Sequence, residues 1–283
     1  MTYYLNFRTS NVGGAVIDPQ LLEGDGTASL LRWSPIPADQ IPARVAGRNI
    51  LFVTHGFNVS QQQGACSLGL LDKYLQLSSP DLLVAVLWPG DSVVPIVDYP
   101  TEGGVAQDCG RRLAIFCNDA CAQAQTVSFV SHSLGARLVL EAVAGLDRKA
   151  RSVCLMAGAI NQDCLVSEYS DATSNAEHIS VLASRQDWVL EVAFSVGDPL
   201  SDLLHPDHTP FEVALGRAGP SLPAPAIVIP PWQIADRENY GHGSYLPPAQ
   251  PVPLPPPPAS QWPRAADFMM RAFEGQPQTW PVP

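Results

Sequence analysis

Short runs of apolar residues, each bounded by turn-forming residues, recur along the first two thirds of the chain. Five runs predict strands that are buried on both faces, at 49–56, 81–90, 126–132, 150–158 and 178–184. Between them, apolar positions spaced three and four apart predict helices at 64–77, 104–123, 134–146 and 160–170. Strands and helices that alternate in this way indicate right-handed crossovers and a mostly parallel α/β sheet with helices on both faces.

Before the first of these strands the pattern is weaker. Strand candidates at 2–8 and 29–34 could form an antiparallel edge of the same sheet. We therefore expect one core domain over residues 1–246.

The end of the chain is rich in proline. Of the 28 prolines, 17 lie at 220–283, and the run PVPLPPPP at 251–258 favours polyproline II because proline cannot continue a central strand or helix. A last helix is predicted from Pro263 to Glu274, ended by Gly275. We expect a proline-rich strap at 247–258, followed by a C-terminal helix and tail at 259–283 that pack on the core.

The strap has an alternative interpretation. Pro248 and Pro251 stand at the P-x-x-P spacing that Pro-binding domains recognise, so the segment could be a ligand for such a partner. This spacing alone is a weak signal, and we favour a stiff strap that leads the last helix back onto the core.

Composition and charge narrow the classes of function. The chain has 283 residues, 46% of them hydrophobic, and a formal net charge of −11. Such an acidic chain is a poor match for nucleic acid or an anionic membrane, since both attract basic surfaces. No basic and apolar leader opens the chain, and no apolar run approaches the roughly 18 residues of a membrane-spanning helix. We expect a soluble, cytoplasmic protein.

The six cysteines do not form a metal-binding pattern. Cys109, Cys117 and Cys121 lie on one face of the helix predicted at 104–123, together with apolar residues, as core cysteines do. The sequence contains no C-x-x-C pair and no Cys/His cluster at zinc spacing. We expect neither a structural metal nor a cofactor.

A serine occupies an unusual place in the stretch VSFVSHSLGARLVL (127–140). A buried strand runs into Ser133, and a helix begins immediately afterwards. A strained strand-turn-helix elbow that exposes a nucleophilic serine needs small residues two positions before and after it, and Ser131 and Gly135 meet that requirement. The pattern is S-x-S-x-G. Taken alone, it fits a serine that merely caps the helix equally well.

A second stretch supplies what a serine nucleophile needs beside it. In LFVTHGFNVS (51–60) a strand ends at His55, Gly56 and Phe57. An oxyanion hole requires two converging N–H groups, and we assign them to Leu134, after the serine, and to Phe57. Gly56 would let the backbone come close. His55 stands where the oxyanion loop belongs, so we interpret it as a residue that shapes the loop.

The serine also needs a general base. In an elbow enzyme of this type the base is a histidine that follows the acid along the chain. His242, between Gly241 and Gly243 in a late loop, is the best candidate, with a solvated loop histidine as the alternative. The other histidines after the serine fit less well, namely His178 at the start of a strand and His205 and His208 in an acidic loop.

The acid that orients this base is predicted to be Asp187. It follows the last confident strand by three residues, at the end of the sheet where a carboxylate can meet His242. The alternative is a surface charge. Asp163, Asp171 and Asp198 are poorer candidates, because they lie before that strand or further along the chain.

These motifs together resemble the α/β-hydrolase superfamily, and more narrowly a bacterial esterase/lipase-like branch known as a domain of unknown function. The resemblance covers about residues 48–246. It is carried by five segments of the chain: His55–Asn58, Trp88–Pro89, Ser131–Gly135, Ser184–Asp187 and, more loosely, His242–Tyr245.

The resemblance implies an α/β-hydrolase fold and a serine ester hydrolase, carboxylesterase- or lipase-like, that acts through an acyl-enzyme on a small or polymeric ester. Too few residues separate the strands at 150–158 and 178–184 for a large cap, although the loop at 196–224 could be a partial lid. Such an open site would suit short-chain or bulky esters. Activity should fall below about pH 6.5, where a histidine base ordinarily becomes protonated.

Other activities remain open at this point. The same residues could serve a thioesterase, an acyltransferase or a peptidase. The chain could also be a non-catalytic binding module on this fold, or a scaffold that uses its proline-rich segment.

Overall fold

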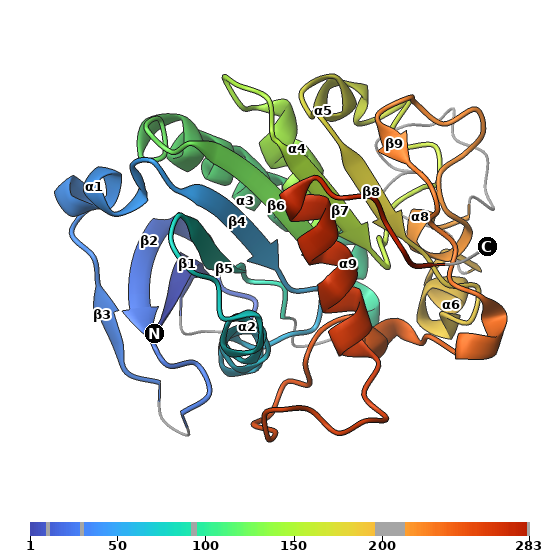
Figure 1. The fold of residues 1–283 in the computed structure, drawn as a ribbon, viewed down its shortest axis with the longest axis horizontal. Helices are drawn as coiled ribbons and strands as arrows, with labels where there is room; N and C mark the ends of the chain where they lie inside the picture. The colour runs from blue at the N-terminus through green and yellow to red at the C-terminus, as the bar shows by residue number, and fades with distance from the viewer. Residues whose placement is uncertain (10–11, 29–30, 92–94, 196–212, 282–283) are drawn as a thin grey trace.

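A nine-stranded sheet runs through the computed structural model, which describes residues 1–9, 12–28, 31–91, 95–195 and 213–281. The strand order is β3-β2-β1-β5-β4-β6-β7-β8-β9 (Figure 1). The strands are β1 (Thr2–Arg8), β2 (Val16–Gly24), β3 (Trp33–Pro35), β4 (Asn49–Thr54), β5 (Asp81–Leu87), β6 (Thr126–His132), β7 (Ser152–Met156), β8 (Ile179–Leu182) and β9 (Val228–Ile229). From β1 through β5, β4, β6, β7 and β8 to β9 all neighbours are parallel, which confirms the predicted α/β class.

Helices cover both faces of the sheet. The longer ones are α2 (Gln61–Leu75), α3 (Pro95–Asp119), α4 (Gly135–Ala144) and α9 (Trp262–Glu274). In Figure 1, α2 and α9 lie in front of the sheet, and α3 and α4 lie behind it. The shorter helical elements are η1 (Ala38–Gln40), α1 (Ile41–Val45), α5 (Ser170–Ser174), α6 (Trp188–Ser195), α8 (Leu215–Ala218), η2 (Asp236–Glu238) and η3 (His242–Ser244). None of the helices in the described residues is long and apolar enough to cross a membrane.

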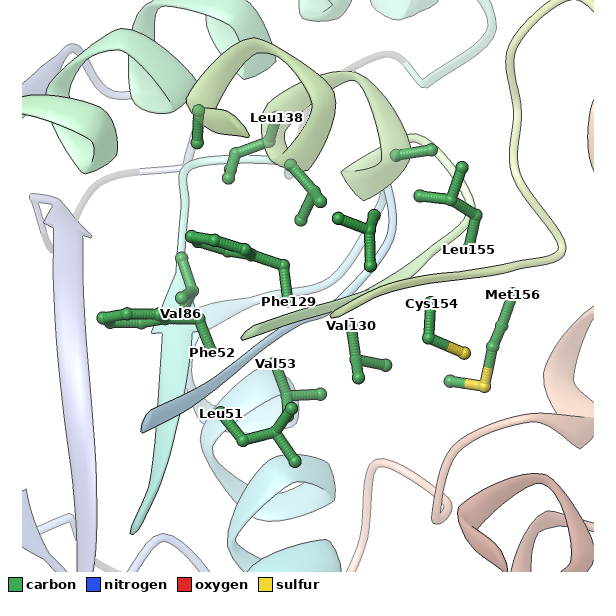
Figure 2. Close-up of a cluster of buried hydrophobic side chains, with 14 of the residues drawn as sticks. Leu51, Phe52, Val53, Val86, Phe129, Val130, Leu138, Cys154, Leu155 and Met156 are labelled. Atoms are coloured by element: carbon green, nitrogen blue, oxygen red, sulfur yellow. The ribbon is translucent and has the colours of Figure 1, made fainter. Parts of the chain in front are cut away.

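The core fills both interfaces between helices and sheet because the central strands are apolar on both faces. Phe52 and Phe129 stack with ring centroids 5.4 Å apart, on the side of the sheet that α4 covers (Figure 2). Leu51 and Val130 point to the opposite side in the same view. All six cysteines are buried and none is joined in a disulfide, including those predicted to line the core face of α3.

The N-terminal strands depart in part from the prediction. β1 pairs antiparallel with β2 and parallel with β5, so it lies inside the sheet and only β2 and β3 extend it as an antiparallel edge. The sequence pattern missed β2 because Pro19 interrupts it. The register between β1 and β2 shifts between Asn6 and Arg8, and proline is tolerated at such an irregularity.

The helix predicted at 160–170 is wrong. Residues 161–169 form successive turns, and only the short α5 follows them. The turns are closed by bonds such as Cys164 N–H to Asn161 O and Val166 N–H to Asp163 O, which span three residues. The Ser167 hydroxyl also donates to the Asp163 carbonyl, and such local bonds compete with a continuous helix. Between β7 and β8, residues 157–178 therefore hold no large cap.

The last helix matches its prediction closely. In α9 a proline occupies the first turn, and Gly275 ends the helix in the left-handed conformation with φ 70°. Trp262 packs edge-on against Tyr74 of α2, with ring centroids 4.7 Å apart. The segment 247–258 between core and helix contains no regular helix or strand. Our division into core, strap and tail stays a prediction.

The register of the central strands determines which loops meet. Thr54 of β4 is paired with Ser131 of β6, and His132 with Met156 of β7. Because these strands are parallel, the segments after them emerge side by side at the carboxyl edge of the sheet. The loop that begins at His55 is thereby brought beside Ser133.

Candidate active site

Ser133 lies in a sharp turn between β6 and α4. Its φ is +55°, a left-handed conformation that is uncommon for a residue with a side chain and costs on the order of 1–3 kcal/mol. Three main-chain bonds hold the turn: Ser133 N–H to Met156 O, Ala159 N–H to Ser133 O and Ala136 N–H to Ser133 O. The strained elbow that the sequence predicts is therefore present, and its strain is balanced by bonds to the neighbouring strand.

The backbone around the elbow is close-packed. A Cβ atom added to Gly56 would lie 2.7 Å from the Ser133 Cβ, and one added to Gly135 would lie 2.7 Å from the His55 carbonyl oxygen. Both distances are shorter than real Cβ contacts allow. Ser131, two positions before Ser133, is fully buried. The need for small residues around Ser133 is thus a direct consequence of how closely the two loops approach.

Three predicted residues form a continuous hydrogen-bonded row. His242 Nε2 lies 2.9 Å from Ser133 Oγ, and His242 Nδ1 lies 2.8 Å from Asp187 Oδ2. Because an ionised carboxylate can only accept, Nδ1 carries the hydrogen, and Nε2 is then free to accept the serine proton. Asp187 is fully buried, and the His242 side chain is 19% exposed. Ser133 is itself only 6% exposed, so the whole row is largely enclosed by the protein.

Asp187 has a second structural role that the sequence did not reveal. Its other oxygen, Oδ1, accepts the Leu190 N–H at 3.1 Å and so caps the N-terminus of α6. The positive end of the helix dipole favours a negative charge at this place. The cap fixes the carboxylate while its remaining oxygen faces His242.

The loop that carries His242 is held mainly by side chains. The Ser184 hydroxyl donates to the Tyr240 carbonyl at 2.7 Å, which ties this loop to the segment that carries Asp187. Gln261, just before α9, receives the Ser244 hydroxyl on its side-chain oxygen and donates to the Glu238 carbonyl. The C-terminal part of the chain thus helps to position the candidate base.

His132 is the residue that sequence analysis missed. It lies between Ser131 and Ser133, and its Nε2–H donates to the His242 carbonyl at 2.8 Å. Burial, with a smaller contribution from nearby His242, lowers the pKa of His132 to about 3. A neutral His132 can therefore link the elbow directly to the base loop without placing a second positive charge beside it. The motif contains this histidine, but its spacing gives no sign of the contact.

The loop after β4 shapes the opposite side of the site. His55 is buried, its Nδ1–H donates to the Gly56 carbonyl at 2.8 Å, and its ring stacks on Trp88 at 5.8 Å. Burial lowers the pKa of His55 to about 4, so it stays neutral. These contacts fit a loop-shaping residue. Phe57 is half-buried on this loop. Leu134 precedes α4, where N–H groups have no intrahelical acceptor.

The other acids and histidines considered lie elsewhere or outside the described residues. His178 precedes β8 and therefore lies at the amino edge of the sheet, away from Ser133. Asp163 and Asp171 lie among the turns at 161–169 and in α5. His205, His208 and Asp198, like most of the candidate lid at 196–224, fall outside the described residues. Within the described part of the chain no group of three or more His, Cys, Asp or Glu side chains is arranged to hold a metal ion.

Comparison with protein families gives one clear match. The model of a family described as "Alpha/beta hydrolase of unknown function (DUF900)" matches residues 39–226, more than half of the chain. The match includes Ser133 and Asp187 and ends before His242. A search of curated proteins gave no match.

Several solved structures are similar to this chain at low identity. A protein of the alpha/beta hydrolase superfamily from Xanthomonas campestris pv. campestris is 15% identical, with 52% of this chain and 80% of that chain covered and a TM-score of 0.33. For esterase PE8 the identity is 13%, the coverage 80% and 94%, and the TM-score 0.41. A lipase-esterase related protein from Clostridium acetobutylicum is 18% identical, with 42% and 46% covered and a TM-score of 0.27.

Proposed function

This chain belongs to the family described as alpha/beta hydrolases of unknown function, and from that premise we propose that it is a serine hydrolase of carboxylic esters. In the proposed reaction Ser133 is the nucleophile, His242 the general base and Asp187 the acid that orients the base. The N–H groups of Leu134 and Phe57 form the oxyanion hole. The product of the first half-reaction is an acyl-enzyme on Ser133.

The observation that carries the proposal is the uninterrupted row from Asp187 through His242 to Ser133, with contacts of 2.8 and 2.9 Å. Three residues from three distant segments meet in the order and at the distances that proton transfer from a serine requires. A helix-capping serine would need neither the histidine nor the buried carboxylate. The left-handed φ of Ser133 adds support, because such strain is characteristic of functional sites.

The first half-reaction begins as Ser133 Oγ attacks the ester carbonyl carbon and its proton passes to His242 Nε2. The carbonyl oxygen becomes an oxyanion that accepts from the Leu134 and Phe57 N–H groups, and each such donor is worth roughly a hundredfold or more in rate. Asp187 stabilises the imidazolium that has formed. His242 then protonates the departing alkoxide, the C–O bond breaks, and the alcohol leaves.

The second half-reaction restores the enzyme. A water molecule gives a proton to His242 Nε2 as its oxygen attacks the acyl carbon. The second tetrahedral intermediate collapses, Ser133 recovers the proton from His242, and the carboxylic acid leaves. His132 and His55 remain neutral throughout, because both pKa values are lowered far below the neutral range.

The proposed substrates are short-chain or bulky esters. Residues 157–178, where a cap would have to be inserted, contain only turns and the short α5. The described residues of that segment therefore offer no cap domain that could form a deep acyl tunnel. A clear preference for long acyl chains would contradict this part of the proposal.

We propose that the protein acts in the cytoplasm. The molecule that it binds there is its ester substrate. The six buried cysteines are thiols that are not joined in disulfides, as is usual in a reducing compartment. A Pro-binding domain that recognises the proline-rich segment at 247–258 would be a second partner, and it rests on the P-x-x-P spacing alone.

The experiment that tests the proposed function is to trap the acyl-enzyme. The protein is mixed with p-nitrophenyl butyrate, quenched in acid and digested, and the peptide that contains Ser133 is examined by mass spectrometry. A butyryl group on Ser133 is expected in the wild type, and none on this peptide in Ser133→Ala. No adduct in the wild type, together with no turnover, would contradict the proposal and favour a binding module.

The kind of bond that the protein cleaves can be identified with substrates that share an acyl group and differ in the leaving group. A butyryl ester, a butyryl thioester and a butyryl anilide present the same acyl group to Ser133, so differences in kcat/KM report on the leaving group. We expect the ester to be cleaved fastest. Faster cleavage of the thioester or the anilide would redirect the assignment to a thioesterase or a peptidase, and transfer to an added alcohol would indicate an acyltransferase.

A further inference from the structure

A buried ion pair lies at the edge of the sheet where the candidate site is built. Arg8 is the last residue of β1, and Asp91 follows β5, the parallel neighbour of β1. The side chains contact each other and are only 2% and 7% exposed. Both lie at the carboxyl edge, where the loop after β4 and the elbow at Ser133 also lie. The reaction proposed above gives neither residue a role.

The guanidinium of Arg8 joins two segments of main chain. Nη1 donates to the Val59 carbonyl at 3.1 Å and to the Trp88 carbonyl at 3.4 Å, while Nη2 contacts the Asp91 carboxylate. Val59 belongs to the loop after β4, and Trp88 and Asp91 to the segment after β5. One buried charge therefore bridges the two loops, and the carboxylate neutralises it.

The same two loops are joined at two further points. The Trp88 indole N–H donates to the His55 carbonyl at 2.9 Å, and the Asn58 N–H donates to the Gly90 carbonyl. Asn58 has a φ of 57°, so the chain turns sharply there. These anchors lie on both sides of Phe57, the candidate second oxyanion donor. Residues 88–91 and Arg8 therefore help to hold the main chain on either side of its N–H.

Small displacements of this loop matter because it touches the nucleophile. At Gly56 there is no room for a Cβ atom, since that atom would lie 2.7 Å from the Ser133 Cβ. A hydrogen-bond donor has to sit within a few tenths of an ångström of its place to stabilise an oxyanion. Deleting the bridge would leave the loop with fewer anchors on the C-terminal side of Phe57.

We propose that Arg8 and Asp91 are positioning residues for the oxyanion loop at 55–59. A planar guanidinium can donate to two carbonyls and a carboxylate at once, which a buried apolar side chain cannot do. This inference rests on the proposed esterase reaction, since it gives the loop its purpose. An ion pair that only stabilised the fold would change the stability of the protein and leave its chemistry intact.

The test uses two variants of the bridge and one matched control in the full chain. Arg8→Met/Asp91→Asn removes the bridge without leaving an unpaired buried charge, so it is the variant that should still fold. Arg8→Lys keeps the charge but loses the fork of donors. Arg148→Met is the control, because Arg148 also donates to two main-chain carbonyls, those of Ala124 and Cys121, in the segment that leads into the amino end of β6.

Two kinds of measurement separate positioning from stability. Hydrogen exchange at residues 57–60 reports on the loop without any reference to activity. Turnover of p-nitrophenyl butyrate gives kcat and KM, and inhibition by n-butaneboronic acid reports on the tetrahedral state, because Ser133 Oγ adds to boron and leaves an oxygen in the oxyanion hole. Thermal unfolding of each variant shows how much stability is lost.

The bridge double variant is expected to exchange faster at 57–60 and to lose roughly tenfold to a hundredfold in kcat, with KM nearly unchanged. Its inhibition constant for the boronic acid should rise by a similar factor, Arg8→Lys should be intermediate, and Arg148→Met should keep kcat and the inhibition constant. Unchanged exchange at 57–60, or faster exchange with an unchanged kcat and inhibition constant, would overturn the inference.

Failure of the esterase assignment would look different. In that case the wild type itself would show no turnover that Ser133→Ala abolishes, whatever the exchange rates of the variants. That outcome would overturn the proposed function and, with it, the positioning role of Arg8 and Asp91. Turnover that depends on Ser133 but is indifferent to the bridge would overturn only the positioning role.

Discussion

The serine and the histidine that meet in the candidate site are held by two different kinds of structure. Ser133 directly follows a central strand, and its turn is fixed by main-chain bonds and by glycines that leave no space. His242 lies in a segment whose only regular elements nearby are η2 and η3. That segment is held by side chains, among them Ser184, His132 and Gln261.

This difference predicts how substitutions in the two regions should affect activity. Around Ser133 an extra methyl group has nowhere to go, so a small change should displace the reacting groups. Around His242 the described residues leave space along the backbone, since a Cβ added to Gly241 or Gly243 would meet none of their atoms within 4 Å. There the losses should come from individual hydrogen bonds, and they should be graded.

The largest loss in kcat is expected when the contact between Asp187 and His242 is changed. Asp187→Asn preserves the shape of the side chain, but its amide can donate to His242 Nδ1 and so stabilise the wrong tautomer. We expect kcat to fall by about a thousandfold to ten-thousandfold, with little change in KM. Steady-state kinetics with p-nitrophenyl butyrate measures this. A loss below tenfold would mean that Asp187 only caps α6.

The next prediction compares a substitution in the close-packed region around Ser133 with one in the loop around His242. Gly56→Ala should lower kcat by on the order of a hundredfold, because the new methyl group must push the oxyanion loop away from Ser133. The matched variant Gly243→Ala should stay within about twofold of the wild type, since a Cβ there would meet no atom within 4 Å in the part of the chain that the structure describes. Equal losses in the two variants would contradict the contrast between the regions.

A smaller effect is expected where the two regions touch. His132→Phe keeps a ring but removes the donor to the His242 carbonyl, and we expect roughly a tenfold loss in kcat from the loosened base loop. His132→Gln, which restores a donor at a similar reach, should recover most of the rate. If Gln were no better than Phe, the ring and not the hydrogen bond would be what matters.

The smallest expected effect is on how the free energy of unfolding changes with pH. The pKa values of His55 and His132 are lowered to about 4 and about 3 in the folded protein, whereas an unfolded histidine titrates near 6.5. Between these values the unfolded state binds more protons, so the stability that the neutral histidines provide is complete above about pH 6.5 and is lost as the pH falls. The loss is at most about 1.4 kcal/mol per pH unit for each histidine.

This prediction can be measured as a difference between two proteins. Urea unfolding of the wild type and of His132→Gln is followed from pH 7 to pH 5. The free energy of unfolding should fall less steeply with decreasing pH in the variant, because one titrating group has been removed. Identical slopes would show that folding does not lower the pKa of His132.

The same contrast explains what could be predicted from the sequence. The strands that carry His55 and Ser133 are continuous apolar runs, so their positions and the elbow between strand and helix followed from pattern alone. β2 was missed because Pro19 stands in it at an irregular register. The pattern at 160–170 suggested a helix, but local main-chain and side-chain bonds close turns there instead.

Contacts between residues that are far apart in the sequence could not be predicted from the pattern of apolar and polar positions. His242 and Asp187 could be chosen only from their order along the chain and from elimination of other candidates, and the structure brings them within hydrogen-bonding distance. The bond from His132 to the His242 carbonyl and the bridge from Arg8 to Val59 join segments that no spacing rule connects. Side-chain bonds of this kind become visible only when the fold is known.

Whether Ser133 is an activated nucleophile is tested by the hydrolysis of p-nitrophenyl acetate, butyrate and octanoate by the wild type and by Ser133→Ala. We expect turnover by the wild type, fastest with the shorter esters, and a loss of at least about a thousandfold in the variant. Equal rates in the two proteins, or no turnover in either, would contradict the proposed role of Ser133.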